Sequence, residues 1–314
     1  MDSIFVDREY FQPANSGAAL AEVFEDFARL TTRLMTSNVA LLVHELWYEM
    51  EVDARMPLYE MLYGRVAAPG ISTGMLTEIS RIFERCATYP DTNDGDYVID
   101  LASAPTQSDA YPAAFNVEPS DLVGIVISTN FSSGPAEISR RDNGVKRRVF
   151  ILTVEKSVIE SFRNHIAEQS CSKDCFDRYA QRAFPALKLN PDLDPENLNV
   201  DLNQLAPKVV AHLSFLNDRY IELGIQEAWD FPRMKAAAAA SGLDFSDESS
   251  NTKKDKKCMH AREVDIVLNG EKKTLSCTLH TKVQPTRGRI HFCVDGMPDT
   301  PHVYVGIMHE HLPT

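Results

Sequence analysis

The chain has 314 residues, of which 44% are hydrophobic and 25% charged, and its formal net charge is −13. This composition is typical of a globular protein with one large or two medium domains, and the acidity argues against a protein that binds nucleic acid over its whole surface. No apolar run approaches the roughly 20 residues of a membrane span, and the N-terminus lacks the basic and apolar regions of a signal peptide. We therefore expect a cytoplasmic protein without a membrane partner, whose six cysteines are reduced thiols.

Hydrophobic periodicity predicts a mixed α and β pattern in the first half of the chain. Apolar residues recur at three- and four-residue intervals from Leu20 to Leu34 and predict a helix over 17–36. The other predicted elements are helices over 57–64 and 73–87 and strands over 39–43, 97–99, 122–128 and 147–154. Asp142-Asn143-Gly144 is a hairpin-turn signal just before the last of these strands.

Helices dominate the middle of the chain, and a polar segment follows them. The predicted helices cover 156–169, 173–184, 203–222 and 227–241. Residues 244–257 are nearly devoid of apolar side chains, which predicts a mobile linker. We therefore predict an α+β protein with a mixed α/β to helical domain over 1–243, a further boundary near residue 155, the linker over 244–257, and a small antiparallel β domain over 258–314.

The C-terminal segment differs from the rest of the chain in charge and pattern. From Cys258 onward the basic and acidic residues balance at six each, so residues 1–257 carry all of the net charge, and six of the nine histidines lie in the neutral segment. Alternation of apolar and polar side chains, with turns at Asn269-Gly270 and over 285–288, predicts an antiparallel meander. Its strands cover 262–268, 273–283, 289–294 and 302–309.

Pairing the second and third of these strands about the 285–288 turn brings cations and histidines together. The simplest register places Lys282 opposite Arg289 and His280 opposite His291. Like charges directly opposite each other destabilise a sheet, so an anion is expected among them. Phosphate fits, because Arg binds it in a bidentate manner and Lys adds a point charge. Histidines near neutrality can then transfer protons in phosphodiester cleavage without a metal or other cofactor.

Two other interpretations of this surface stay open. Lys and Arg on the solvent face of a strand often only keep the protein soluble. A zinc site is the second alternative, since His and Cys are zinc ligands. Cys277 and His280 point to opposite faces of a regular strand, which disfavours this pair as a chelate. The candidate ligand sets are Cys258-Met259-His260, Cys277-x-x-His280, His291-Phe292-Cys293 and His309-Glu310-His311.

The rest of the chain offers few motifs. The phosphate loops GxGxxG and GxxxxGK[ST] are absent, as are the hydrolase motifs GxSxG and HExxH. Glu45, Glu49 and Glu51 form a carboxylate cluster near His44. We interpret this cluster as the solvated end of a helix or strand.

Four short runs carry a resemblance that covers about a sixth of the chain. They are His-Ala-Arg-Glu from His260, Leu-His-Thr-Lys from Leu279, Gly-Arg-Ile-His-Phe from Gly288, and Val-Tyr-Val-Gly-Ile-Met-His-Glu-His-Leu from Val303. Together they resemble a C-terminal module of uncharacterised bacterial proteins from mobile or phage-defence islands. A basic β-meander behind helices is also similar in outline to the RelE/ParE-type ribonuclease toxins, although those toxins are small and basic throughout.

The toxin resemblance implies that Lys282, Arg287, Arg289 and His291 line an RNA site. Our leading hypothesis is an effector of bacterial phage defence that binds or cleaves nucleic acid, with RNA favoured. If it is an enzyme, it is a metal-independent ribonuclease in which His280 and His291 are catalytic and Arg262 also binds substrate. The alternatives are a non-enzymatic interaction subunit that binds a partner protein, and a small zinc-binding module.

Overall fold

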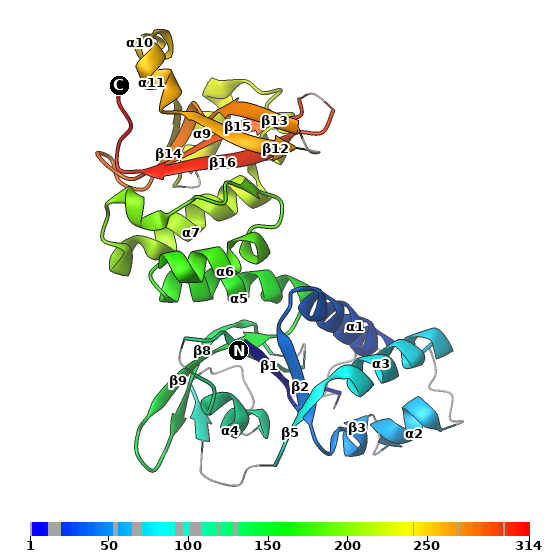
Figure 1. The fold of residues 1–314 in the computed structure, drawn as a ribbon. Helices are drawn as coiled ribbons and strands as arrows, with labels where there is room; N and C mark the ends of the chain where they lie inside the picture. The colour runs from blue at the N-terminus through cyan, green and yellow to red at the C-terminus, as the bar shows by residue number, and fades with distance from the viewer. Residues whose placement is uncertain are drawn as a thin grey trace. The chain divides into compact units, whose positions relative to one another are not determined.

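The computed structural model describes residues 2–11, 20–52, 56–64, 71–91, 97–100, 108–118, 120–128, 131–240, 242–268, 271–297 and 299–314. The chain forms two compact units, Met1–Phe162 and Arg163–Thr314 (Figure 1). Helices and strands, with an antiparallel strand set at the C-terminus, confirm the predicted α+β class. Within the described residues, no helix combines the length and apolar character that a membrane span requires.

A seven-stranded mixed sheet forms the centre of the first unit. In spatial order its strands are β5 (Ala87–Tyr89), β2 (Ala40–His44), β1 (Ser3–Val6), β7 (Val123–Val126), β9 (Lys146–Leu152), β8 (Gly134–Arg140) and β6 (Tyr97–Ile99). The first five are parallel, and β8 and β6 add antiparallel pairs. The chain moves outward from β1 through β2 to β5, forms β6 at the opposite edge of the sheet, and then enters β7 on the other side of β1. This order makes the carboxyl end of β1 a topological switch point, where open α/β sheets commonly bind ligands.

Helices cover both faces of this sheet (Figure 1). Phe5, Ile125 and Ile151 pack with Ala110 and Tyr111 of the helix α4 (Ala110–Phe115) on one face. On the other side Phe27 and Phe83 stack at 5.4 Å between α1 (Leu20–Thr36) and α3 (Thr73–Arg85). The remaining elements of the unit are the 3₁₀ turn Trp47–Glu49, β3 (Glu51–Val52), β4 (Met56–Pro57) and α2 (Leu58–Tyr63).

Most predicted elements of this unit are present. The Asp142-Asn143-Gly144 turn joins β8 to β9, with Gly144 at φ +66°. The helix α4 lies in a stretch without clear periodicity, and β1 has only four residues, so neither was predicted. The first residues of the expected 17–36 helix lie outside the described residues.

A five-stranded sheet and a separate hairpin form the strand layer of the second unit. The sheet order is β10 (Lys188–Leu189), β16 (His302–His309), β15 (Arg289–Asp295), β14 (Leu279–Lys282) and β11 (Phe245–Asp247), and the hairpin consists of β12 (Glu263–Leu268) and β13 (Glu271–Ser276). Tyr220 of α8 packs against Phe245 and Phe292, which fixes one sheet face on the helices. The unit boundary falls within α5 (Glu155–Glu168), and the other helical elements of the second unit are α6 (Lys173–Ala183), the 3₁₀ turn Pro195–Leu198, α7 (Leu202–Asp218), α8 (Tyr220–Gln226), α9 (Phe231–Ala240), α10 (Ser250–Lys254) and α11 (Lys256–His260).

The structure corrects two expectations about this unit. The predicted strand 273–283 is interrupted at Cys277 and Thr278, so β13 pairs with β12 in its own hairpin and only β14 joins the sheet. The four strands therefore do not form one continuous meander, and the expected Asn269-Gly270 turn lies outside the described residues.

The second correction concerns the expected linker over 244–257. This segment folds as β11, α10 and α11, and Phe245 is completely buried. The two units divide at Phe162, near the further boundary suggested at residue 155, and residues 163–243 belong with the C-terminal strands. The buried side chain of Phe245 anchors this polar segment to the unit. The overall composition of the segment did not reveal this anchor.

Candidate functional site

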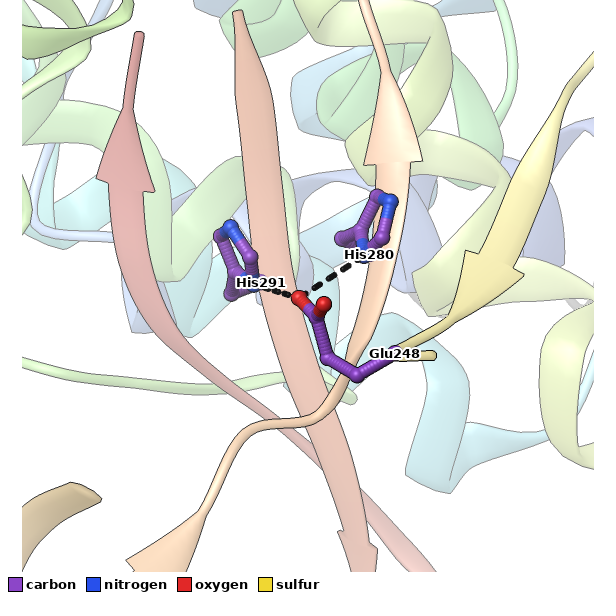
Figure 2. Close-up of side chains that lie close together, drawn as sticks. All are labelled: Glu248, His280 and His291. Carbon is purple, nitrogen blue, oxygen red and sulfur yellow. Dashed lines mark ion pairs between the residues drawn. The ribbon is translucent and has the colours of Figure 1, made fainter. Parts of the chain in front are cut away.

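An edge strand brings an acidic side chain to the two histidines that the sequence paired. The predicted register is confirmed, because His280 lies opposite His291 and Lys282 lies opposite Arg289 in β14 and β15. On the other side of β14, β11 places Ser246 opposite His280. Glu248 follows β11, and its side chain points between the two imidazoles (Figure 2).

One carboxylate oxygen is close to both histidines. Glu248 Oε1 lies 3.5 Å from His280 Nδ1 and 3.9 Å from His291 Nδ1. One ligand-type atom from each of the three side chains lies within 4.8 Å of the other two. This separation is compatible with a common bound ion after small side-chain movements.

The three side chains are almost completely removed from solvent. Their exposed fractions are 7% for Glu248, 11% for His280 and 2% for His291. Burial lowers the pKa of His280 to about 4 and that of His291 to about 3, because the protonated imidazole loses hydration. Both rings are therefore neutral near pH 7, with nitrogen lone pairs that a metal ion can use.

The buried ring nitrogens lack good hydrogen bonds. Nδ1 of His280 and both nitrogens of His291 have no hydrogen-bond partner within the part of the chain that the structure describes. An unpartnered buried polar group is costly, so each such group calls for an explanation such as a bound water or ion. Because both rings lie beside the Glu248 carboxylate, one bound ion there would be a common partner for these nitrogens.

Arg262 holds the carboxylate from the opposite direction. Its Nε lies 2.8 Å from Glu248 Oε1 in an ion pair, and its side chain is 1% exposed. A terminal nitrogen also donates to the backbone carbonyls of Cys258 and Pro313 at 2.6 and 2.9 Å. Arg262 therefore neutralises Glu248 and fixes its position, as partners of metal-binding carboxylates commonly do.

The other predicted substrate-binding cations have different surroundings. Arg289 is buried and donates to the carbonyls of Gln284, Pro285 and Arg287, so its guanidinium stabilises the β14–β15 turn. Lys282 forms a hydrogen-bonded ion pair at 3.0 Å with Asp244. The side chain of Arg287 is exposed.

The negative charge expected among these cations is present, and carboxylates of the chain itself provide it. Asp244 and Glu248 both come from the segment that composition identified as a linker, and they offset the cross-strand pairs of like groups. The roles of His280 and His291 in catalysis, and of Lys282, Arg287, Arg289 and Arg262 in substrate binding, stay predictions.

The zinc ligand sets suggested by the sequence differ from the set that the structure brings together. Among the described residues, the group of three or more metal-type ligands consists of Glu248, His280 and His291. His280 and His291 come from two of the suggested sets, while their cysteine partners Cys277 and Cys293 contact each other instead. Glu248 was missed because its neighbours in sequence are polar and no pattern there marks a strand.

A second polar site lies at the switch point of the first unit. Asp7 follows β1 directly, is 2% exposed, and accepts hydrogen bonds from the Ser108 hydroxyl and the Glu9 backbone. Burial raises the pKa of Asp7 to about 6. The cavity there measures about 330 Å³ and is lined by Asp7, Arg8, Glu9, Glu49, Glu51, Ser108 and Asp109. The predicted carboxylate cluster therefore contributes Glu49 and Glu51 to a cavity wall.

No protein-family model, curated protein or solved structure matches this chain. The functional argument rests on the geometry of these side chains.

Proposed function

We propose that the second unit binds a divalent transition-metal ion through Glu248, His280 and His291. The observation that carries the proposal is the pair of buried, unpartnered imidazoles on either side of one buried carboxylate. Two imidazoles and one carboxylate are a ligand set used for catalytic zinc and for non-haem iron. Mg²⁺ and Ca²⁺ prefer oxygen ligands and fit this set poorly.

The charge around the site indicates what would complete the coordination. Glu248 and Arg262 neutralise each other, and the two imidazoles are uncharged near pH 7. The charge of a bound divalent ion would therefore be largely uncompensated, which favours an anionic further ligand such as hydroxide or a phosphate oxygen. A metal ion of this kind lowers the pKa of bound water and supplies a nucleophile for hydrolysis.

Cleavage of a phosphodiester, with RNA as the favoured substrate, is the second candidate function. It is supported by Lys282, which is partly exposed and lies two residues from His280 in β14, and by the exposed Arg287 in the turn that follows. Incubation of labelled RNA with the protein, with and without EDTA, distinguishes metal-dependent cleavage from metal-independent cleavage. Cleavage that EDTA abolishes indicates a metal-dependent site, and cleavage that resists EDTA indicates acid–base catalysis by the histidines alone. A role in phage defence and the interaction-subunit alternative stay predictions.

Equilibrium dialysis of the full chain against Zn²⁺, followed by elemental analysis, tests the metal site. We expect one tightly held ion per chain in the wild type and at least a tenfold loss of affinity in His280→Ala and Glu248→Gln, because each removes a ligand. Co²⁺ serves as a second probe, since its visible absorption reports nitrogen and oxygen coordination without any substitution. A wild-type protein that binds neither ion above the level of His280→Ala and Glu248→Gln would disprove the site.

The chain contains a matched pair for the control. His260 Nδ1 lies 3.0 Å from Glu263 Oε2, but the His260 side chain is 86% exposed. We expect His260→Ala and Glu263→Gln to leave zinc binding unchanged, since both residues lie outside the ligand group. Equal losses in this exposed pair and in the buried site would point to nonspecific surface binding.

A further inference from the structure

Two thiols lie next to the histidines of the second unit. Cys277 Sγ is 3.9 Å from Cys293 Sγ, and both cysteines are free. Cys277 follows β13 and stands three residues before His280, while Cys293 lies in β15 two residues after His291. The pair therefore connects the segments that carry both histidines.

The surroundings of the pair keep the two sulfurs close together. Cys277 is fully buried in a small apolar cluster with Val264, Leu275 and Tyr304, and Cys293 packs against this cluster while remaining partly exposed. A Cβ atom at Gly306 would come within 2.5 Å of Cys277 Sγ. Gly306 thus leaves the space that the Cys277 thiol occupies.

We propose that Cys277 and Cys293 are an oxidisable pair that closes a disulfide on reaction with a peroxide. Cys293 loses its proton and the thiolate attacks one peroxide oxygen, which forms a sulfenic acid; the hydroxide or alkoxide that leaves takes up this proton as water or an alcohol. Cys277 loses its proton and attacks the sulfenic sulfur, and the hydroxide that leaves takes up this proton as water. The two sulfurs together lose two electrons, and the peroxide gains them.

The contact between the thiols assigns their separate roles. The Cys277 thiol donates to the Cys293 sulfur, so Cys293 is the acceptor in this contact. Cys293 is also the partly exposed member of the pair, so a peroxide reaches it first. A disulfide requires the sulfurs to approach to about 2.0 Å, which rotations of the two side chains can provide if the main chains permit it.

Closure of this disulfide is expected to weaken metal binding, a consequence that rests on the proposed function. The main chain of Cys277 lies against the His291 ring without forming a good hydrogen bond. Movement of Cys277 toward Cys293 would therefore displace the group that abuts His291. Changes in groups that orient metal ligands typically cost about 10–100-fold in affinity.

Peroxide treatment of the metal-free full chain, followed by alkylation of free thiols and peptide mass spectrometry, tests the pair. We expect the loss of two of the six thiols and a cross-linked peptide that joins Cys277 to Cys293. Cys277→Ser and Cys293→Ser are each expected to abolish the cross-link. Cys258→Ser removes another buried thiol of the same unit and is expected to leave the cross-link unchanged.

Full alkylation of Cys277 and Cys293 after treatment, or a cross-link of either one to a different cysteine, would overturn the proposal. A second measurement compares zinc affinity before and after oxidation, and we expect a drop of roughly tenfold or more in the wild type but not in Cys277→Ser. The cross-link is scored without metal, so failure of zinc binding would remove the metal site and leave the result for the thiol pair intact.

Discussion

Asp7 in the first unit and Glu248 in the second are buried acidic residues that directly follow a strand, but their neighbours differ. Asp7 is held by a hydroxyl and a backbone N–H, and burial raises its pKa to about 6. Glu248 is held by the buried guanidinium of Arg262 and lies beside two neutral imidazoles. Desolvation raises the pKa of Asp7 despite its two neutral donors, whereas the direct partner of Glu248 is a cation.

This contrast separates the chemistry that each site suits. A carboxyl group with a pKa near 6 can exchange a proton near neutral pH, as a general acid or base does. A charge-paired carboxylate with adjacent imidazoles is suited instead to a metal ion. Three substitutions test the comparison.

The largest effect is expected from Glu248→Gln in the metal-free protein. The substitution leaves the charge of Arg262 buried without its counter-ion, and breaking a buried ion pair typically costs about 3–5 kcal/mol. Because Arg262 keeps two carbonyl acceptors, we expect a loss near the lower end, about 3 kcal/mol. Amide hydrogen exchange in peptides from β14 and β15 measures the stability of this region.

Two companion variants show whether the pair is responsible. Glu263→Gln changes an exposed carboxylate of the same unit and should alter stability by less than about 0.5 kcal/mol. Arg262→Met combined with Glu248→Gln removes both charges and should be more stable than Glu248→Gln alone. If Glu248→Gln is as stable as the wild type, the buried charge of Arg262 does not need Glu248 as its counter-ion.

An effect of similar size, which depends on pH, is expected for Asp7→Asn. The folded state raises the pKa of Asp7 from about 3.9 to about 6, so it binds the proton more tightly than the unfolded chain does. The free energy of unfolding therefore falls as pH rises from about 4 to about 6, by about 3 kcal/mol for two pKa units. Asn at this position has no such titration, so the wild type should lose stability relative to the variant across this window.

Chemical denaturation of both proteins at a series of pH values measures this difference. Other groups titrate in the same window, so the relevant quantity is the free energy of unfolding of the wild type minus that of the variant at each pH. Asp142→Asn, which changes an exposed aspartate of the same unit outside this cavity, provides the control. A difference that stays constant between pH 4 and 7 would show that Asp7 does not titrate with a raised pKa.

Much of the architecture follows from local pattern. Three- and four-residue spacing predicted α1 and α3, and turn residues predicted the turn before β9 and the β14–β15 hairpin, although β8 itself was not predicted. The cross-strand register of the latter hairpin also followed, because the 285–288 turn leaves little freedom in pairing. That register was sufficient to bring His280 and His291 together from sequence.

The partners of these histidines depend on contacts that local pattern does not encode. Glu248 reaches the site because Phe245 is buried and β11 adds to the edge of β14, although the surrounding residues are polar. Arg289 was expected to bind substrate, yet its donors are directed to three carbonyls of its own turn. Asp7 belongs to a strand of only four residues, which is too short for periodicity to reveal.

The smallest stability effect is expected from Lys282→Ala, which also sharpens the question of substrate binding. Its ion pair with Asp244 is partly exposed, so its loss should cost less than about 1 kcal/mol, and less still at high salt. Lys273→Ala removes a similar exposed pair with Asp295 and provides the control for general loss of positive charge. Salt-sensitive RNA binding that falls in Lys282→Ala but not in Lys273→Ala would locate the phosphate contact beside the histidines. Equal binding by both variants would leave Lys282 a structural partner of Asp244 and would direct the search for an anion to the interior of the site.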